Sequence, residues 1–341
     1  MIIAYSNPYT GNDFGQFFIT FFYRFYQFMT GQLQWKELVS DEIQLLVLSG
    51  IALASALVGS FLVLRKMAML ANALSHTILL GIVLAFIITR HLALGEELSQ
   101  GIDFRAMLIA SVVTGIATTF LTEFFHKTAR LQEDASIGLV FTSLFALGIL
   151  LVTVFTRNAH IGTEVVMGNA DALHIDDIGL AWKIFLGDAI IIILFFKEFQ
   201  ATTFDIGFSR AVGISTPFFN YLLMILVSAT AIGAFRAVGV LMVLAFLVAP
   251  ALSARLLTNS LKKLLWIAMG LSVLATFCGV ALARHLLSVY DMPLSTGGVI
   301  VCMLVVIYIV AIILSPNRGV LARILNQRAV LNTIGTKKAQ D

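Results

Sequence analysis

Apolar residues come in long runs along most of this chain, and each run has about the length of a bilayer span. A helix that crosses a membrane needs about 20 apolar residues. Runs without a charged side chain cover residues 43–64, 135–156, 264–283 and 292–317. The run 67–89 is interrupted only by His76, and the run 106–122 is shorter but still adequate.

Two further runs contain charged residues. Residues 218–254 are apolar except for Arg236, and the stretch is long enough for two spans hinged at that residue. Residues 178–196 carry Lys183 and Asp188, which makes this run the weakest candidate for a span. Together the runs predict an all-α polytopic membrane protein with about nine transmembrane helices, within a range of about eight to ten.

The first 40 residues differ from the rest of the chain. The aromatic stretch 14–31 has Arg24 at its centre, which favours a helix at the membrane interface over a tenth span. We expect residues 1–40 to be an N-terminal extension with an interfacial or extra membrane helix. Residues 41–316 then form the transmembrane domain, and residues 317–341 form a short basic cytoplasmic tail.

Two features of the apolar runs concern helix packing. Small residues at helical spacing let helix backbones approach closely in lipid. The first charge-free run has such a set, which predicts a packing seam along Ala52, Ser55, Ala56, Gly59 and Ser60. Pro250 lies inside another run, where it removes one backbone hydrogen bond and is expected to kink its helix.

Composition excludes a soluble protein and gives an orientation. Of the 341 residues, 59% are hydrophobic and 12% are charged, whereas soluble domains carry about 25% charged residues. The net charge of +3 reflects cytoplasmic loops rather than nucleic-acid binding. Placing the Arg65–Lys66 turn in the cytoplasm puts most of the 22 Lys and Arg residues there, together with the C-terminus.

Motifs for nucleotide hydrolysis and for intramembrane proteolysis are absent from the sequence. There is no G-x-x-x-x-G-K-[ST] phosphate loop, so the chain is not expected to hydrolyse ATP by itself. There is neither an H-E-x-x-H pair nor a G-x-S-x-G motif, and ionisable residues inside the runs are few. We therefore do not expect this chain to be an enzyme.

His76 lies in the apolar stretch "RKMAMLANALSHTILLG" (65–81), where hydrocarbon is expected. Asn72 precedes it by one helical turn, so the two side chains share one helix face. Polar groups within a span are costly and usually face a cavity or a partner, and imidazole binds zinc and other first-row metal ions. Asn72 and His76 are therefore a candidate metal site in a pore; the alternative is a buried histidine bonded to another helix.

Three segments, in order along the chain, resemble a single family. They are "GSFLVLRKMAMLANALSHTILLGIVLAF" (59–86), "EDASIGLVFTSLFALGILL" (133–151), and a segment that starts "FDIGFSRAVGISTPFF" (204–219) and ends "RAVGVLMVLAFLVAPALSARLL" (236–257). Together they resemble the permease subunits of metal-chelate ABC importers of the ABC-3 type, which take up zinc, manganese or iron. The resemblance covers roughly residues 43–315 and implies a fold like that of a type II ABC importer permease.

The resemblance implies roles for particular residues. The residues that match the family's short cytoplasmic helix, which contacts the ATPase, are Phe204, Asp205, Arg210, Ala211 and Gly213. A carboxylate suits the start of such a helix, and a glycine suits its end. The alternative is a capped surface helix between two spans. The residues that match the family's candidate gate and helix kink are Arg236, Gly239 and Pro250.

Asn72 departs from the family pattern, because relatives usually have aspartate at this position. Asparagine keeps a carbonyl ligand but loses the negative charge, so a divalent ion would be held more weakly. In one account, this chain pairs with an aspartate-bearing permease, so that the dimer still presents a carboxylate. In the other account, the position makes a hydrogen bond in a gate, and its charge is secondary.

The resemblance also implies the partners. We expect a permease in the bacterial cytoplasmic (inner) membrane that moves a divalent ion of manganese, zinc or iron and holds no permanently bound cofactor. Two permease copies, as a homo- or heterodimer, would work with ATPase subunits and an extracytoplasmic metal-binding protein. Membrane lipid surrounds the chain, and no nucleic acid is involved. The alternatives are a stand-alone secondary ion transporter, disfavoured by the isolated Asp188, and a polytopic membrane enzyme.

Overall fold

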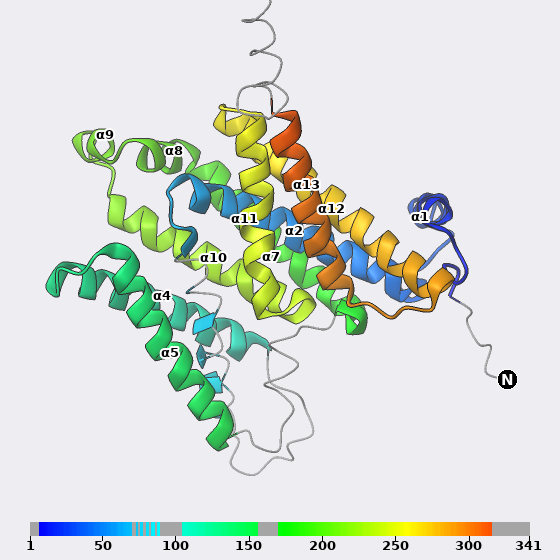
Figure 1. Ribbon diagram of the computed structural model, residues 1–341, viewed down its shortest axis with the longest axis horizontal. Helices are drawn as coiled ribbons and strands as arrows, with labels where there is room; N and C mark the ends of the chain where they lie inside the picture. Colours follow the sequence, from blue (N-terminus) through cyan, green and yellow to red (C-terminus); the bar gives the residue numbers. More distant parts are fainter. Residues whose placement is uncertain are drawn as a thin grey trace, which may run out of the picture.

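The chain forms a bundle of helices (Figure 1). The computed structural model describes residues 7–69, 73, 76–77, 80–81, 83–85, 87–88, 104–155 and 170–315, and no strand occurs among them. The helices are α1 (Phe14–Met29), α2 (Ser40–Leu64), α4 (Phe104–Thr128), α5 (Glu133–Phe155), α7 (Ile175–Leu194), α8 (Phe196–Phe204), α9 (Ile206–Ala211), α10 (Thr216–Val238), α11 (Val240–Leu257), α12 (Leu261–Tyr290) and α13 (Thr296–Leu314). Two short 3₁₀ helices are η1 (Trp35–Glu37) and η2 (Ala170–Ala172).

Five of the described helices are long and apolar enough to cross a membrane. They are α2, α10, α12 and α13, together with α5 over Ala135–Val154. The count within the described residues is six if α7 and α8, which meet at a bend of 74°, form one span. The predicted all-helical membrane fold is confirmed, but the predicted count of about nine spans is not. The run 67–89 lies partly outside the described residues, although every described residue between 68 and 88 is helical.

Helix α2 is the centre of the bundle. It packs against α7, α10, α11 and α12, and 89% of the residues in its most apolar stretch are buried. The small residues of the predicted seam explain this close packing, since Ala52, Ser55, Ala56, Gly59 and Ser60 are all buried. Ser272 Oγ of α12 donates a hydrogen bond of 2.9 Å to the carbonyl oxygen of Ala52. The predicted seam is therefore confirmed.

The break between α10 and α11 lies at Gly239 and not at Arg236. Arg236 is within α10, which ends at Val238, and α11 begins at Val240. Gly239 has φ +84°, a conformation that costs glycine little and other residues much. The hinge predicted at Arg236 was therefore wrong, because backbone geometry rather than the position of a charge sets the break. Helix α11 continues through Pro250 to Leu257, and the kink expected there stays a prediction.

Helix α1 lies across one end of the bundle. Figure 1 shows α1 end-on, whereas α2 runs across the view, so the two helix axes cross. Helix α1 packs on α12, where the rings of Phe21 and Phe277 are 5.4 Å apart. With 16 residues, α1 is too short to be counted among the helices that could cross a membrane. A helix that lies across the bundle end is compatible with an interfacial position, which stays a prediction.

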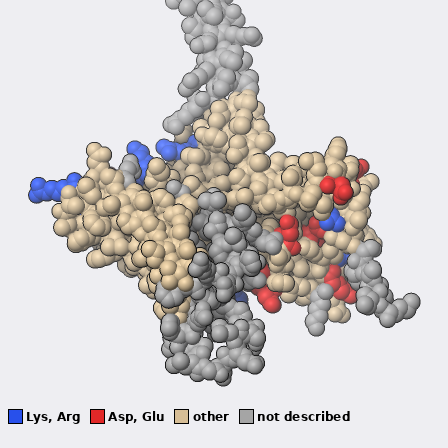
Figure 2. All heavy atoms as spheres, turned by 60° about the horizontal axis from the view of Figure 1, so that its bottom comes forward, with Lys and Arg blue, Asp and Glu red and all other residues tan. Residues whose placement is uncertain are grey.

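Charged residues divide between the two ends of the bundle. Figure 2 shows Lys and Arg mainly over the end that carries α8 and α9, and Asp and Glu gathered at the opposite end near α1. We refer to these as the α9 end and the α1 end. Because cytoplasmic loops of membrane proteins are rich in Lys and Arg, the division favours the predicted orientation, with the α9 end inside.

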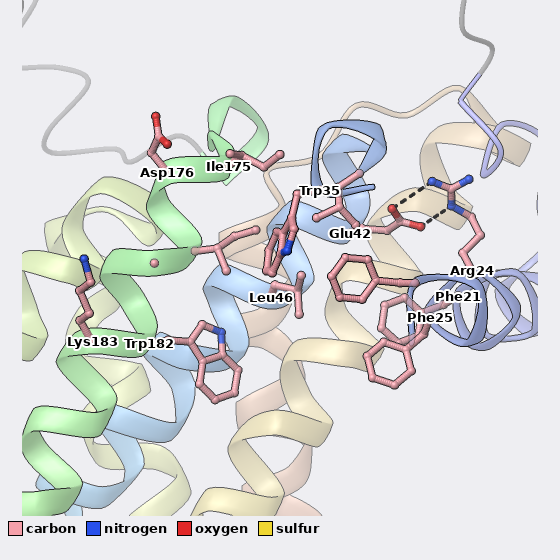
Figure 3. A pocket seen from close by; sticks show the side chains of 14 residues that line it. Phe21, Arg24, Phe25, Trp35, Glu42, Leu46, Ile175, Asp176, Trp182 and Lys183 are labelled. Atoms are coloured by element: carbon pink, nitrogen blue, oxygen red, sulfur yellow. Dashed lines mark hydrogen bonds and ion pairs between the residues drawn. The ribbon is translucent and has the colours of Figure 1, made fainter. Parts of the chain in front are cut away.

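A pocket of about 640 Å³ lies at the α1 end, between α1, α2 and α7 (Figure 3). Its walls are mostly apolar, and Phe21, Phe25 and Trp182 point into it. At its edge, Arg24 forms an ion pair with Glu42. The described residues around this pocket include none of the predicted site residues, so it is separate from the candidate transport path.

Candidate functional site

His76 packs against aromatic rings of α5. Its imidazole centroid is 5.2 Å from the ring of Phe141 and 5.2 Å from the ring of Phe145, and the side chain is half-buried. Thr77, the next residue, accepts a hydrogen bond of 3.0 Å from Thr118 Oγ1 of α4. The helical segment with His76 therefore contacts both α4 and α5. Asn72 lies outside the described residues, so the proposed pairing of Asn72 with His76 stays a prediction.

The face formed by α4 and α5 is only partly covered by the chain itself. Only 17% of the residues in the most apolar stretch of α5 are buried, compared with 89% in that of α2. Large apolar side chains are exposed along both helices: Ile109, Val113, Phe120, Leu139, Leu147, Leu150 and Val154. His76 lies on the other side of this helix pair, because Phe141 and Phe145 of α5 and Thr118 of α4 are about half a helical turn around from these side chains. The exposed side chains thus form a face that has room for lipid or for a second protein. We call it the α4/α5 face.

The described residues contain no group of three or more His, Cys, Asp or Glu side chains that could hold a metal ion. His76 is therefore not part of a complete, permanent metal site within the described part of the chain. A single imidazole could still be one ligand of a transient site whose other ligands come from outside it.

The predicted cytoplasmic helix is α9, and its ends are capped as its sequence suggests. Asp205 is the N-cap, and its Oδ1 accepts a hydrogen bond of 2.8 Å from the backbone N–H of Phe208. Gly213 has φ +86° after the helix, and the N–H of Ile214 donates to the carbonyl oxygen of Ser209 at 2.8 Å. This left-handed glycine ends the helix in the usual way. Arg210 lies in the last turn, where a cation favours the helix dipole.

Exposed apolar side chains surround α9; the sequence prediction included Phe204 and Ala211 but missed Ile206, Phe208 and Val212. Phe204, Ile206, Phe208 and Val212 are each at least half exposed, while Ala211 is also exposed. They lie at the end of the bundle where Lys and Arg gather (Figure 2). Apolar clusters rimmed by polar residues mark protein interaction sites. The signal was present in the sequence "FDIGFSRAV", in which large apolar residues recur within a segment too short to span a membrane.

The candidate gate residues lie around the break between α10 and α11. Gly239 is at the break itself, and a Cβ added to Gly297 of α13 would lie 3.2 Å from Val238 Cγ1. The backbone at the start of α13 therefore approaches the break closely. Arg236 lies one turn before the break and Pro250 lies within α11. The structure thus brings Arg236 and Gly239 near one another but separates them from α9, at the opposite end of α10.

A buried carboxylate lies within the bundle. Asp188 of α7 is 3% exposed and accepts a hydrogen bond of 2.6 Å from Thr230 Oγ1 of α10. The bond joins the two long helices whose connection contains α8 and α9. An ionisable residue at this depth is costly and usually has a functional or structural partner, which here is Thr230.

Comparison with curated proteins gives relatives over most of the chain. A "Probable metal transport system membrane protein" of Chlamydia muridarum (strain MoPn / Nigg) is 39% identical over 330 residues, covering 97% of this chain and 98% of that protein. The "Manganese transport system membrane protein MntD" of Bacillus subtilis (strain 168) is 34% identical, covering 80% of this chain and 91% of that protein. The "Zinc transport system membrane protein TroD" of Treponema pallidum (strain Nichols) is 33% identical, covering 82% and 75%.

Comparison with solved structures and with families agrees. The structure described as "PsaBC from Streptococcus pneumoniae in complex with Fab" shares the fold, with a TM-score of 0.70 and 24% sequence identity. The match covers 84% of this chain and 94% of that chain. The ABC 3 transport family matches residues 43–315, which include His76, the α4/α5 face, α9 and the break at Gly239. The chain described here is therefore a member of the ABC 3 transport family.

Proposed function

We propose that this chain is the transmembrane permease of an ABC importer that moves a divalent transition-metal ion into the bacterial cytoplasm. The observation that carries the proposal is α9, a short capped helix with exposed apolar side chains at the basic end of the bundle. The names of relatives support manganese or zinc as the ion, and iron is the third candidate. A separate ATPase subunit supplies the energy, because the chain has no phosphate loop.

Each partner has a matching surface in this proposal. The ATPase docks on α9 and on the apolar residues around it. A second permease, of the same or a different sequence, covers the exposed α4/α5 face. The extracytoplasmic metal-binding protein delivers the ion at the α1 end. The complex lies in the cytoplasmic (inner) membrane, with the basic α9 end inside.

Disrupting α9 is expected to uncouple ATP hydrolysis from uptake. In the variant Asp205→Lys/Gly213→Val, the N-cap bond to Phe208 is lost, at a cost of about 1 kcal/mol. A valine at φ +86° adds backbone strain of about 1–2 kcal/mol. Metal uptake should fall to background in proteoliposomes that contain the permease and its ATPase.

The matched control is Asp176→Lys, which reverses an exposed first-turn carboxylate of α7 at the α1 end. This control should keep the coupling of the wild type. If uptake and permease-stimulated hydrolysis both survive in the α9 variant, the assignment of α9 to the ATPase contact is wrong.

His76 is expected to be required for passage of the ion. His76→Ala removes the imidazole beside Phe141 and Phe145 and should lower uptake roughly ten-fold or more, equivalent to about 1.4 kcal/mol. Asn72→Asp restores a carboxylate and should change the preference between Mn²⁺ and Zn²⁺. Uptake of the two radiolabelled ions, separately and in competition, measures both effects.

The control for this pair is His126→Ala, an exposed histidine at the end of α4 that bonds to a backbone carbonyl. It should leave uptake unchanged. Wild-type uptake and selectivity in both His76→Ala and Asn72→Asp would exclude a pore site at these positions.

A stand-alone secondary ion transporter is the second candidate, because Asp188 is a buried carboxylate inside the bundle. Such a transporter would move the ion without an ATPase. Uptake into vesicles that contain the purified chain alone, driven by a proton gradient, would support it. Uptake that requires the ATPase and ATP would support the importer.

A further inference from the structure

Arg65 connects three helices at the α9 end of the bundle. It is the C-cap residue of α2, and its guanidinium donates three hydrogen bonds. Nε donates to Thr203 Oγ1 at 3.0 Å, Nη2 to Thr202 Oγ1 at 2.6 Å, and Nη1 to Asn220 Oδ1 at 2.5 Å. The same group lies 5.7 Å from the ring centroid of Phe199. One side chain thus ties the end of α2 to α8 and to α10.

Along the chain, the three acceptors flank α9. Thr202 and Thr203 are in the last turn of α8, which ends at the residue before Asp205, and Asn220 is in the first turns of α10. A movement of α9 relative to α2 must therefore either carry Arg65 along or break these bonds. The aromatic ring of Phe199 under the guanidinium also contacts Phe61 of α2, at 5.5 Å, and Phe219 of α10, at 5.4 Å.

The acceptors are oriented toward Arg65. Thr202 Oγ1 donates its own proton to the carbonyl oxygen of Glu198 at 2.8 Å, and Thr203 Oγ1 donates to the carbonyl oxygen of Phe199 at 2.6 Å. Since each hydroxyl proton is already used, the oxygen lone pairs are available for the guanidinium. The planar fork of arginine directs donors from three separate nitrogens toward these acceptors, whereas lysine carries all its donors on one nitrogen.

The charge on Arg65 is retained without a carboxylate among these three acceptors. Burial lowers the pKa of Arg65 to about 10, which still leaves the group cationic at neutral pH. Removing a cation from water costs free energy unless hydrogen bonds compensate. The side chain therefore combines a cost in desolvation with a specific three-way contact, as expected for a group that fixes the relative position of helices.

On its other side along the chain, Arg65 leads into the segment that carries His76. The backbone turns at Lys66, which has φ +61°, and the N–H of Met67 donates to the carbonyl oxygen of Leu62 at 2.9 Å. Every described residue from 68 to 88 is helical. A displacement of Arg65 is thus transmitted through one tight turn to the start of the segment that carries His76.

We propose that Arg65 is the positioning residue that couples α9 to the segment that carries His76, so that movement of the α8–α9–α10 unit changes access to the transport path. The inference rests on the proposed function, in which α9 contacts the ATPase and His76 lines the path. Arg65 touches neither the ion nor the nucleotide. It acts by making the α2 turn follow the two elements that flank α9.

The test uses the permease–ATPase complex in proteoliposomes and three variants. Arg65→Gln removes the charge and most of the fork, and Thr203→Val removes one acceptor with almost no change in shape. Lys66→Gln is the matched control, because Lys66 is the adjacent exposed cation in the same turn. Uptake of radiolabelled Mn²⁺ and Zn²⁺ is measured together with ATP hydrolysis and with recovery of the ATPase in the complex.

A second readout reports the movement itself. Cys278 and Cys302 are replaced by serine, and Ala73, a buried residue three positions before His76, is replaced by cysteine. Labelling of this cysteine by a water-soluble maleimide is compared with and without ATP. A purely structural role for Arg65 would lower stability in both states but would not remove the difference between them.

We expect Arg65→Gln to keep the ATPase bound and hydrolysing while uptake falls roughly ten-fold or more and ATP-dependent labelling at position 73 disappears. Thr203→Val should show the same changes to a smaller degree, and Lys66→Gln should behave like the wild type. If Arg65→Gln does not fold, the loss of ATP-dependent labelling in Thr203→Val alone supports the proposal.

Unchanged uptake and ATP-dependent labelling in Arg65→Gln or, if that variant does not fold, in Thr203→Val would overturn the coupling role of Arg65 and leave the importer intact. A wild-type complex that takes up metal without ATP would instead remove the proposed function and this inference together.

Discussion

Replacing Gly59 with alanine is expected to prevent the permease from reaching its folded state. A Cβ at this position would lie 1.9 Å from the carbonyl oxygen of Leu247 and 2.7 Å from its carbonyl carbon. These are backbone atoms of α11, so no side-chain rotation relieves the clash, and α2 and α11 would have to separate. Overpacking a core costs about 1–3 kcal/mol, and more where backbones collide.

The measurement is the yield of monodisperse protein in detergent and its thermal unfolding midpoint. The matched control is Gly270→Ala in α12, because nothing lies within 4 Å of a Cβ added there. That control should be neutral or slightly stabilising, since alanine favours a helix over glycine by about 1 kcal/mol. A Gly59→Ala protein with the wild-type midpoint would mean that α2 and α11 are less tightly packed than described.

Removing the carboxylate of Glu42 is expected to detach the N-terminal segment from the bundle. Glu42 is buried and forms an ion pair with Arg24, with Nε–Oε1 2.5 Å and Nη2–Oε2 3.2 Å (Figure 3). It also accepts a hydrogen bond of 2.9 Å from Tyr9 Oη and one of 3.1 Å from Val39 N–H. In Glu42→Leu these donors lose their acceptor, and the cost of leaving a buried charge without its partner is about 3–5 kcal/mol.

Limited proteolysis between α1 and α2, together with thermal unfolding, measures the effect. The double variant Arg24→Met/Glu42→Leu should recover much of the loss, because two apolar side chains replace a buried pair at little cost. Lys127→Ala removes the partner of Glu123 in an exposed ion pair and should change stability by less than about 1 kcal/mol. If Glu42→Leu were no less stable than the double variant, the Arg24–Glu42 pair would not hold α1.

Features set by local sequence could be predicted. The seam of α2 follows from small residues at helical spacing, and all of them are buried. The caps of α9 follow from Asp205 and Gly213, whose side-chain chemistry and backbone freedom suit the two helix ends. The membrane class follows from the length of the apolar runs. In each case the cause lies within about one or two helical turns of the residue concerned.

Features set by distant contacts could not be predicted. The Arg65–Lys66 pair indicates orientation when seen in sequence, but the acceptors of Arg65 are 137 to 155 residues away. His76 contacts Phe141 and Phe145, which lie in a different apolar run, and nothing in either run indicates that the two pack together. The break between α10 and α11 was predicted at the charged Arg236, but the backbone of Gly239, with its positive φ, sets it.

The bend of 74° between α7 and α8 allows α8 to act as a short lever that carries α9 at its far end. With nine residues at a rise of 1.5 Å each, α8 is a lever about 13 Å long. Helix shifts of about 1–2 Å are enough to switch a packed interface between two states. At the tip of this lever, such a shift requires a rotation of only roughly 4–9° about the bend. In the proposed importer, a shift of about 1–2 Å in an ATPase docked on α9 would therefore be enough to rotate α8 about the bend.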